Sequence, residues 1–94
     1  MISLFKDDDA GYDSWLRANP AGYVVNTYRL PSAAYLMLHR SWCRTISGTP
    51  TRGSSWTTKD YSKVCAPFVG ELTVWAREEL GGTLQSCGTC HPPT

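Results

Sequence analysis

The chain has 94 residues, of which 41% are hydrophobic and 18% are charged, and its formal net charge is +1. This composition indicates one small globular domain and excludes a disordered chain, and apolar runs far shorter than ~20 residues exclude a membrane-spanning helix. Because a domain of this size buries only about 60–65% of its unfolded surface, a metal ion would be a useful supplement to its core.

The first third of the chain predicts a short strand, a helix and a longer strand. Residues 2–5 suit either a short strand or a disordered lead. The aspartates at 7–9 offer an N-cap and an acidic first turn for a helix that Asn19-Pro20 ends. Tyr23–Tyr28 is rich in β-branched and aromatic residues, so we expect a strand there.

The middle of the chain predicts strands joined by loops. Residues 35–39 form a second strand-like run, which we expect to pair with Tyr23–Tyr28 as a hairpin. Residues 47–55 are Ser, Gly, Thr, Pro and Arg, which is typical of a loop. We expect a third strand to begin at residues 56–58 and to continue through residues 61–65.

A second helix is predicted near the C-terminus. Pro67 suits its first turn, and Gly81-Gly82 suits its end. Its buried stripe is expected at Val69, Leu72, Ala76 and Leu80.

Two pairs of residues have the spacing of metal ligands. His39 and Cys43 are separated by three residues, and Cys87 and Cys90 by two. Imidazole nitrogen and thiolate sulfur are ligands that a tetrahedral zinc ion takes, so we expect these four residues to hold one zinc. The fold class that follows is α+β: one small zinc-stapled domain over residues 1–94, with a short antiparallel sheet and two helices. Residues 1–34 supply a helix and the first strand, and residues 35–92 the zinc-knuckle part.

Other roles for the cysteines and histidines stay open at this point. No export signal is visible at the start, so we expect a cytoplasmic protein, where cysteines bind metal more often than they pair. Four cysteines also permit two disulfides. His91 could replace His39 as the fourth ligand, and Cys65 is expected as a small buried hydrophobe, with a ligand or nucleophile role as the alternative.

Positive charge is concentrated in the middle of the chain. Between Arg29 and Lys63 there are six basic residues and one acidic residue, whereas acidic residues are in excess at both ends. A basic stretch with interleaved aromatic residues is what a phosphate-contacting surface needs, so double-stranded DNA is the expected partner. The predicted DNA-binding residues are Arg40, Trp42, Arg44, Arg52, Trp56, Lys59, Tyr61 and Lys63.

The ligand order and spacing carry a family resemblance. Leu38-His39-Arg40-Ser41-Trp42-Cys43-Arg44, then a helix, then Cys87-Gly88-Thr89-Cys90-His91-Pro92 resembles the metal-binding domain of the Ada DNA-repair protein, over residues 35–92. The resemblance implies a small α+β zinc domain that binds DNA. In that family the first ligand of the pair separated by three residues is the methyl-accepting cysteine. Here the position is His39, a far poorer acceptor, so the resemblance does not carry the methyl transfer over.

A weaker resemblance concerns the first half. Trp15-Leu16, Asn19-Pro20, Gly22-Tyr23 and Val25-Asn26, together with the His39-Arg40 segment, look like small modules that accompany bacterial modification-dependent restriction endonucleases. This resemblance implies a reader of modified bases associated with a restriction system, and it supplies no catalytic residue.

The expected function is therefore a non-catalytic, zinc-containing DNA-binding module that reads modified (methylated) DNA. Trp42 and Trp56 are the candidates for base contact, with a place in the core as the alternative for both. One alternative function is a methyl-acceptor repair protein that uses Cys43 or Cys65. Another is a zinc-stabilised module for protein interaction.

Overall fold

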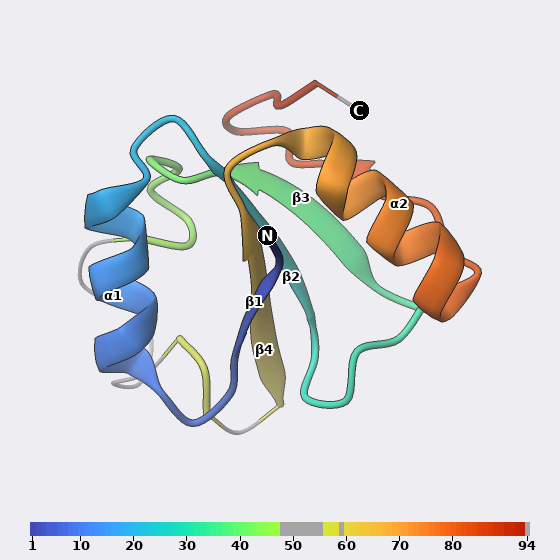
Figure 1. Cartoon of the computed structure of the whole chain (residues 1–94), viewed down its shortest axis with the longest axis horizontal. Coiled ribbons are helices and arrows are strands. Elements are labelled where there is room, and N and C mark those ends of the chain that lie inside the picture. Colours follow the sequence, from blue (N-terminus) through green and yellow to red (C-terminus); the bar gives the residue numbers. More distant parts are fainter. Residues whose placement is uncertain (48–55, 59, 94) are drawn as a thin grey trace.

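In the computed structural model, which describes residues 1–47, 56–58 and 60–93, a five-stranded sheet separates two helices (Figure 1). The helices are α1 (Asp9–Ala18) and α2 (Val69–Leu80). The strands are β1 (Ser3–Phe5), β2 (Tyr23–Tyr28), β3 (Leu36–Arg40), β4 (Tyr61–Ala66) and β5 (Gln85–Ser86). The predicted α+β class with two helices is confirmed.

The sheet has the strand order β1-β4-β2-β3-β5. The predicted hairpin forms, with Tyr23 opposite Arg40 and Thr27 opposite Leu36. The sheet is mixed rather than purely antiparallel, because β5 pairs with β3 in the parallel sense. The chain reaches that edge only after it has passed through α2, which is the long crossover that a parallel neighbour needs.

Local chemistry fixes the ends of both helices. The Asp8 side chain accepts a hydrogen bond from the backbone N–H of Gly11 at 2.9 Å, which caps α1, and Asn19 ends this helix before Pro20. Gly81 has a φ of 62° at the end of α2, a left-handed conformation that glycine adopts without a Cβ clash. Pro67 lies outside α2, whose N-cap is Phe68, so the prediction of Pro67 in the first turn was wrong.

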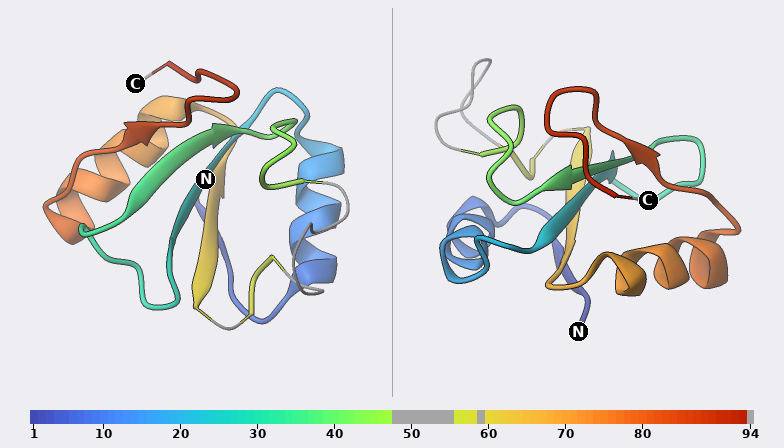
Figure 2. Two further views of the ribbon diagram at one scale, coloured as in Figure 1. Left: turned by 180° about the vertical axis from the view of Figure 1, so that it is seen from behind. Right: turned by 90° about the horizontal axis from the view of Figure 1, so that it is seen from above.

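The two faces of the sheet bury different cores. Side chains alternate between faces along a strand, so neighbours such as Val24 and Val25 on β2 point in opposite directions. Val25 packs with Leu38, Leu72 and Ala76 under α2. Val24 belongs to a second core, which contains Tyr12 of α1 and all four cysteines. Its other buried members are Cys43, Ile46, Cys65, Cys87 and Cys90. Figure 2 shows α1 and α2 on opposite sides of the sheet.

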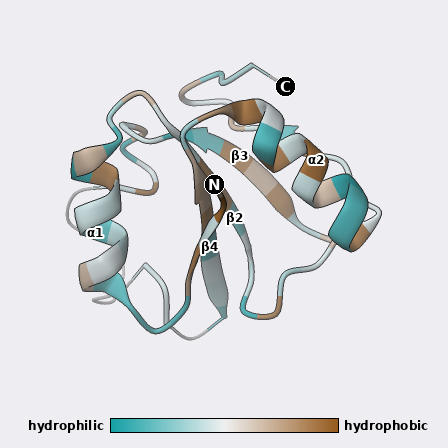
Figure 3. Ribbon diagram, viewed as in Figure 1, coloured by the Kyte–Doolittle hydropathy of each residue, from teal (hydrophilic) through white to brown (hydrophobic). Residues whose placement is uncertain are grey.

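The amphipathic pattern of α2 follows from this arrangement. Hydrophobic and hydrophilic residues alternate along the helix (Figure 3), and Leu72 and Ala76 are fully buried while Val74 is 46% exposed. Among the described residues, no helix is long and apolar enough to cross a membrane.

The third strand is shorter than the sequence predicts. Residues 56–58 form bends, and β4 begins only at Tyr61. The backbone N–H groups of Trp56 and Thr57 donate to the Asp9 carboxylate at 2.9 and 2.8 Å, which holds this segment against the start of α1 instead of in the sheet.

Candidate metal centre

Four side chains converge at one end of β3. The ligand atoms of His39, Cys43, Cys87 and Cys90 all lie within 4.8 Å of one another, and all four residues are buried. The Sγ atoms of Cys43 and Cys87 are 3.9 Å apart. A tetrahedral ion with bonds of about 2.3 Å would hold two sulfurs about 3.8 Å apart, so this spacing fits a shared metal ion.

Backbone pairing brings the two ligand pairs together. β5 pairs with β3, and the Cys87 N–H donates to the Leu38 carbonyl at 2.9 Å, which places Cys87 beside His39. The C-terminal segment follows β5 along this edge of the sheet (Figure 2). A turn returns Cys43 to the end of β3, since its N–H donates to the Arg40 carbonyl at 3.0 Å.

Helix α1 also supports the site, through the core that it shares with the ligands. The buried Tyr12 hydroxyl donates to the Ile46 carbonyl at 2.5 Å and so fixes the segment that follows Cys43. Tyr12 and Cys43 also share the core on this face of the sheet.

The His39 imidazole is set up to bind a metal through one nitrogen. Its Nε2 atom is buried and has no hydrogen-bond partner among the described residues, whereas Nδ1 lies 3.3 Å from the Thr45 hydroxyl. A buried polar atom without a partner costs free energy that a metal bond at Nε2 would recover. Burial, followed by the positive charge of Lys63, lowers the pKa of His39 to about 4, so the ring is neutral at pH 7, as a ligand must be.

The thiols receive backbone hydrogen bonds. Thr89 N–H donates to Sγ of Cys87, and Arg40 N–H donates to Sγ of Cys90, both at 3.3 Å. For Cys87 burial opposes ionisation, but the N–H groups of Cys90 and Thr89 outweigh it and lower the pKa to about 7. For Cys90 burial dominates and raises the pKa to about 11. N–H donors stabilise thiolates, which are the form that binds a metal.

Thr45 is a supporting residue that the sequence did not reveal. Its hydroxyl lies 3.0 Å from the Cys43 sulfur as well as 3.3 Å from His39 Nδ1, so it contacts two of the four ligands. Such outer partners orient metal ligands. Its position two residues after a ligand is the only sequence signal, and that signal is weak.

The other cysteine and histidine lie outside this set. Cys65 is fully buried on β4, and burial raises the pKa of its thiol well above the usual range, so it acts as a small core residue. His91 is exposed and does not converge with the four ligands. All four cysteines are free thiols, and the 3.9 Å between the Cys43 and Cys87 sulfurs is far longer than a disulfide bond of about 2.05 Å.

Three of the predicted DNA-binding residues lie together beside the metal centre. Trp42 is 61% exposed and Arg44 is exposed. The Arg40 guanidinium lies 6.0 Å from the centre of a Trp42 ring and donates to the carbonyls of Cys90 and His91 at 3.1 and 3.2 Å. Arg40 therefore ties this surface to the C-terminal segment.

The remaining predicted residues do not join that surface. Lys63 is only 2% exposed, and its ammonium donates to the Asn26 amide oxygen and the Trp56 carbonyl at 2.8 and 2.7 Å, so the prediction of a surface lysine was wrong. Trp56 is half-buried against the core near the cysteines. Tyr61 is exposed, but it lies at the opposite end of the sheet. Arg52 and Lys59 lie outside the described residues.

Comparison of the chain with protein-family models, with curated proteins and with solved structures found no match. The site must therefore be interpreted from its own geometry.

Proposed function

We propose that the chain is a small zinc domain in which the metal has a structural role and supports a DNA-binding surface. The observation that carries the metal assignment is the convergence of the unpartnered His39 Nε2 with three thiols. One nitrogen and three sulfurs form a soft ligand set, which favours zinc over magnesium or calcium. Four protein ligands also complete a tetrahedral site, and no position remains for a reactive water.

The absence of a methyl-accepting thiol at position 39 supports a non-catalytic role. His39 occupies the place of the acceptor cysteine in the Ada-like pattern. Cys65 is buried and protonated, and Cys43 belongs to the ligand set. Cys65 is therefore unsuited to accept a methyl group, and Cys43 does not stand at the acceptor position of the Ada-like pattern.

The DNA part of the proposal depends on the residues between and beside the ligands. Trp42 lies between His39 and Cys43, so a bound metal would restrict its backbone, and Arg44 follows Cys43 directly. Arginine at this place would contact phosphates, and the exposed Trp42 ring would contact a base or its methyl group. The Ada resemblance supports the same partner.

The metal is tested by elemental analysis of protein purified without chelator. We expect one zinc per chain. Protein that contains no metal and does not bind added zinc would overturn the proposal at its first step.

The DNA surface is tested by the salt dependence of duplex binding. Arg40 and Arg44 are the described cations beside the metal centre, so together they should give a slope of log K against log salt of about −2. Arg44→Ala should weaken binding to every sequence and flatten the slope by about one unit. Arg17→Ala, an exposed arginine on α1 that pairs with Asp13, is the matched control.

Recognition of modified bases is tested with methylated and unmethylated duplexes. A cytosine methyl packed on Trp42 should raise the affinity for the methylated duplex roughly fivefold, because burial of one methyl group contributes about 1 kcal/mol. Trp42→Ala should abolish the preference and keep the zinc. Equal binding of both duplexes by the wild-type protein would leave a DNA-binding module without modification specificity, whereas no duplex binding at low salt would favour a protein-interaction role.

A further inference from the structure

A second exposed feature lies at the other end of the sheet from the metal centre. Tyr28 ends β2, Tyr61 begins β4 directly opposite it, and Tyr35 lies immediately before β3. We call these three residues the tyrosine platform. Tyr28 and Tyr61 are 43% and 42% exposed, although large aromatic side chains usually cover a core.

The three rings contact one another. Ring centres are 5.6 Å apart for Tyr28 and Tyr35, 6.1 Å for Tyr28 and Tyr61, and 6.0 Å for Tyr35 and Tyr61. The Tyr28 ring is tilted by only 26° from Tyr61 and 36° from Tyr35. Because the rings fill the space between themselves, the platform has no gap for a cation of the kind that an aromatic cage binds. A ligand must lie on its outer surface.

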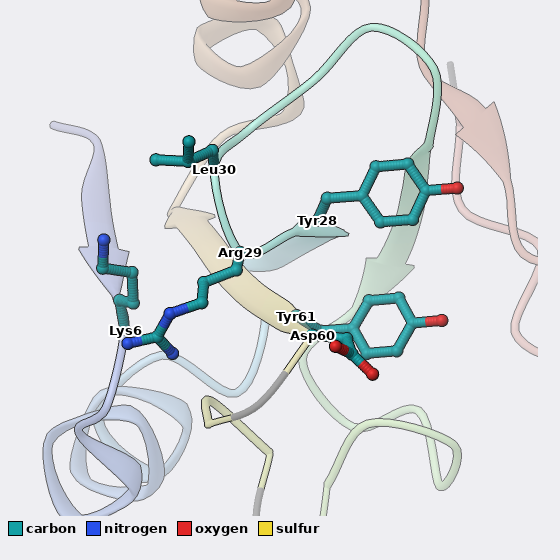
Figure 4. A pocket seen from close by; sticks show the side chains of 6 residues that line it. All are labelled: Lys6, Tyr28, Arg29, Leu30, Asp60 and Tyr61. Carbon is teal, nitrogen blue, oxygen red and sulfur yellow. The ribbon is translucent and has the colours of Figure 1, made fainter.

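The charges beside the platform balance. The adjoining hollow, of about 730 Å³, is lined by Lys6, Tyr28, Arg29, Leu30, Asp60 and Tyr61 (Figure 4). Arg29 is bound by Asp7 through two hydrogen bonds, and Lys6 and Asp60 carry opposite charges. In Figure 4 the two tyrosine side chains point to the same side, away from Lys6 and Arg29. The platform therefore offers ring surface and hydroxyl groups, not a concentration of charge.

The platform and the metal centre share one face of the sheet. Met37 and His39 lie on the same face of β3, and Tyr35, immediately before the strand, continues this spacing; Met37 packs against the core near the cysteines. Four residues of strand span about 13 Å, which is about four base steps of one DNA strand. Arg40, the next residue of β3 after His39, points to the opposite face, so a strand of nucleic acid that contacts Arg40 must pass from one face of the sheet to the other to reach the tyrosines.

We infer that the tyrosine platform stacks unpaired nucleobases, and thus that the chain binds a junction between duplex and single-stranded DNA; the inference rests on the proposed DNA-binding function. Every base has a flat aromatic face, so an exposed group of rings binds unpaired bases with little regard to sequence. Duplex bases are already stacked on one another and cannot use this surface. Phosphate contacts remain the task of the arginines at the metal centre.

The test compares a blunt duplex with the same duplex carrying a four-nucleotide unpaired overhang. Wild-type protein should bind the overhang duplex about tenfold more tightly, which corresponds to one well-stacked base. The double variant Tyr28→Ala, Tyr61→Ala should bind both with the affinity of the blunt duplex, and the salt slope should not change. The double variant Tyr28→Phe, Tyr61→Phe keeps the rings and should keep the preference.

Two controls separate loss of stacking from loss of folding. Phe68→Ala removes an aromatic residue that is 70% exposed near the start of α2 and should leave the preference unchanged. In a second measurement on the wild-type protein alone, 2-aminopurine in the overhang should lose fluorescence on binding, because stacking quenches it. This measurement needs no variant.

The outcomes distinguish the inference from the function on which it rests. If wild-type protein binds neither DNA, the proposed function fails and the inference with it. If it binds the blunt duplex without gain from the overhang, or if the gain survives the alanine variant, only the inference is overturned. A proline-rich peptide that binds the wild type and not the alanine variant, in place of the overhang, would assign the platform to a protein partner.

Discussion

His39 limits the chemistry of the three thiols around it. With a neutral imidazole in place of a fourth thiolate, a zinc ion bound here would be surrounded by one negative charge fewer than in a four-cysteine site, so each sulfur would be a weaker nucleophile. The buried Nε2 has no hydrogen-bond partner among the described residues, so this atom is available to bind a metal. A histidine at this position would thus suit a stable structural site better than a methyl-accepting one.

Cys87, a candidate ligand, and Cys65, a buried core residue, allow a matched pair of variants that tests the ligand set. Cys87→Ser should lose the metal, because a serine hydroxyl is a poor zinc ligand at neutral pH. Cys65→Ala should keep one zinc per chain and lose only about 1 kcal/mol of unfolding free energy, since it removes one small buried group. Zinc content and thermal unfolding measure both effects, and loss of zinc in the Cys65 variant would contradict the ligand set.

Lys63 makes stability depend on pH in a specific direction. Burial lowers the pKa of its ammonium in the folded chain to about 8 from the usual 10.5, and Cys65 and Asp9 only partly oppose this. Below pH 8 both folded and unfolded chains hold the proton, and the folded state carries the full cost of a buried ammonium. Between about pH 8 and 10.5 the unfolded chain binds more protons than the folded chain, so stability rises with pH.

Lys63→Met isolates this effect. The unfolding free energy of the wild type, relative to that of the variant, should rise by about 3 kcal/mol as the pH rises from below 8 to above 10.5. Each unit of pKa difference between the folded and unfolded chains corresponds to about 1.4 kcal/mol. Denaturant unfolding of both proteins across this range measures the difference, and contributions of other groups cancel. A difference that stays constant with pH would show that the ammonium is not buried.

At the scale of elements, α2 and the metal centre stabilise different faces of the sheet. Leu72 is fully buried under α2, whereas Val74 on the same helix is 46% exposed. Leu72→Ala should therefore cost about 2–5 kcal/mol of unfolding free energy, and Val74→Ala less than about 1 kcal/mol. Both variants should retain one zinc, because neither residue lies on the face that holds the ligands. Zinc loss in a folded Leu72 variant would contradict this separation.

The elements that the sequence predicts well are those with strong local signals. β2 matches the prediction at both ends, because all residues of Tyr23–Tyr28 except Asn26 are β-branched or aromatic. β5 was missed, since two exposed polar residues carry no periodic pattern and only pairing with β3 makes them a strand. Residues 56–58 were predicted as strand, but the Asp9 carboxylate, far away in sequence, holds them as bends.

For the candidate site, ligand spacing was informative and charge was not. The two short pairs identified the four converging residues, because zinc ligands are often close in sequence. The basic middle did not become one surface: Lys63 lies on the same face of β4 as the buried Cys65 and turns inward. A count of charges does not show on which face a residue lies, whereas the period of the strand does.

For the whole molecule, a metal ion at this site would add four bonds between segments that the β3–β5 pairing and the Arg40 hydrogen bonds already bring together. The ligands come from the end of β3 and from the segment after β5, and they lie in the core that also holds α1. Structural zinc contributes about 10–16 kcal/mol in small zinc peptides, which equals or exceeds the total stability of about 5–15 kcal/mol of a typical domain.

Removal of the metal should therefore unfold most of the domain. Chelation under reducing conditions should remove most of the far-ultraviolet circular dichroism of the sheet and helices, and added zinc should restore it. The Cys65→Ala protein should behave as the wild type. A chelated protein that keeps its full signal and its cooperative thermal transition would mean that the two cores suffice without metal.

The strand order also sets the sequence of events during synthesis. β2, β3 and β4 occupy the middle of the sheet, and the first and last strands occupy its edges. His39 and Cys43 leave the ribosome long before Cys87 and Cys90. The contact between Cys43 and Cys87 closes a loop of 44 residues, and the one between Arg40 and Cys90 a loop of 50 residues. Closing such loops costs entropy, which slows the formation of non-local contacts. The nascent chain must therefore wait, with its first ligand pair exposed, until Cys87 and Cys90 have emerged.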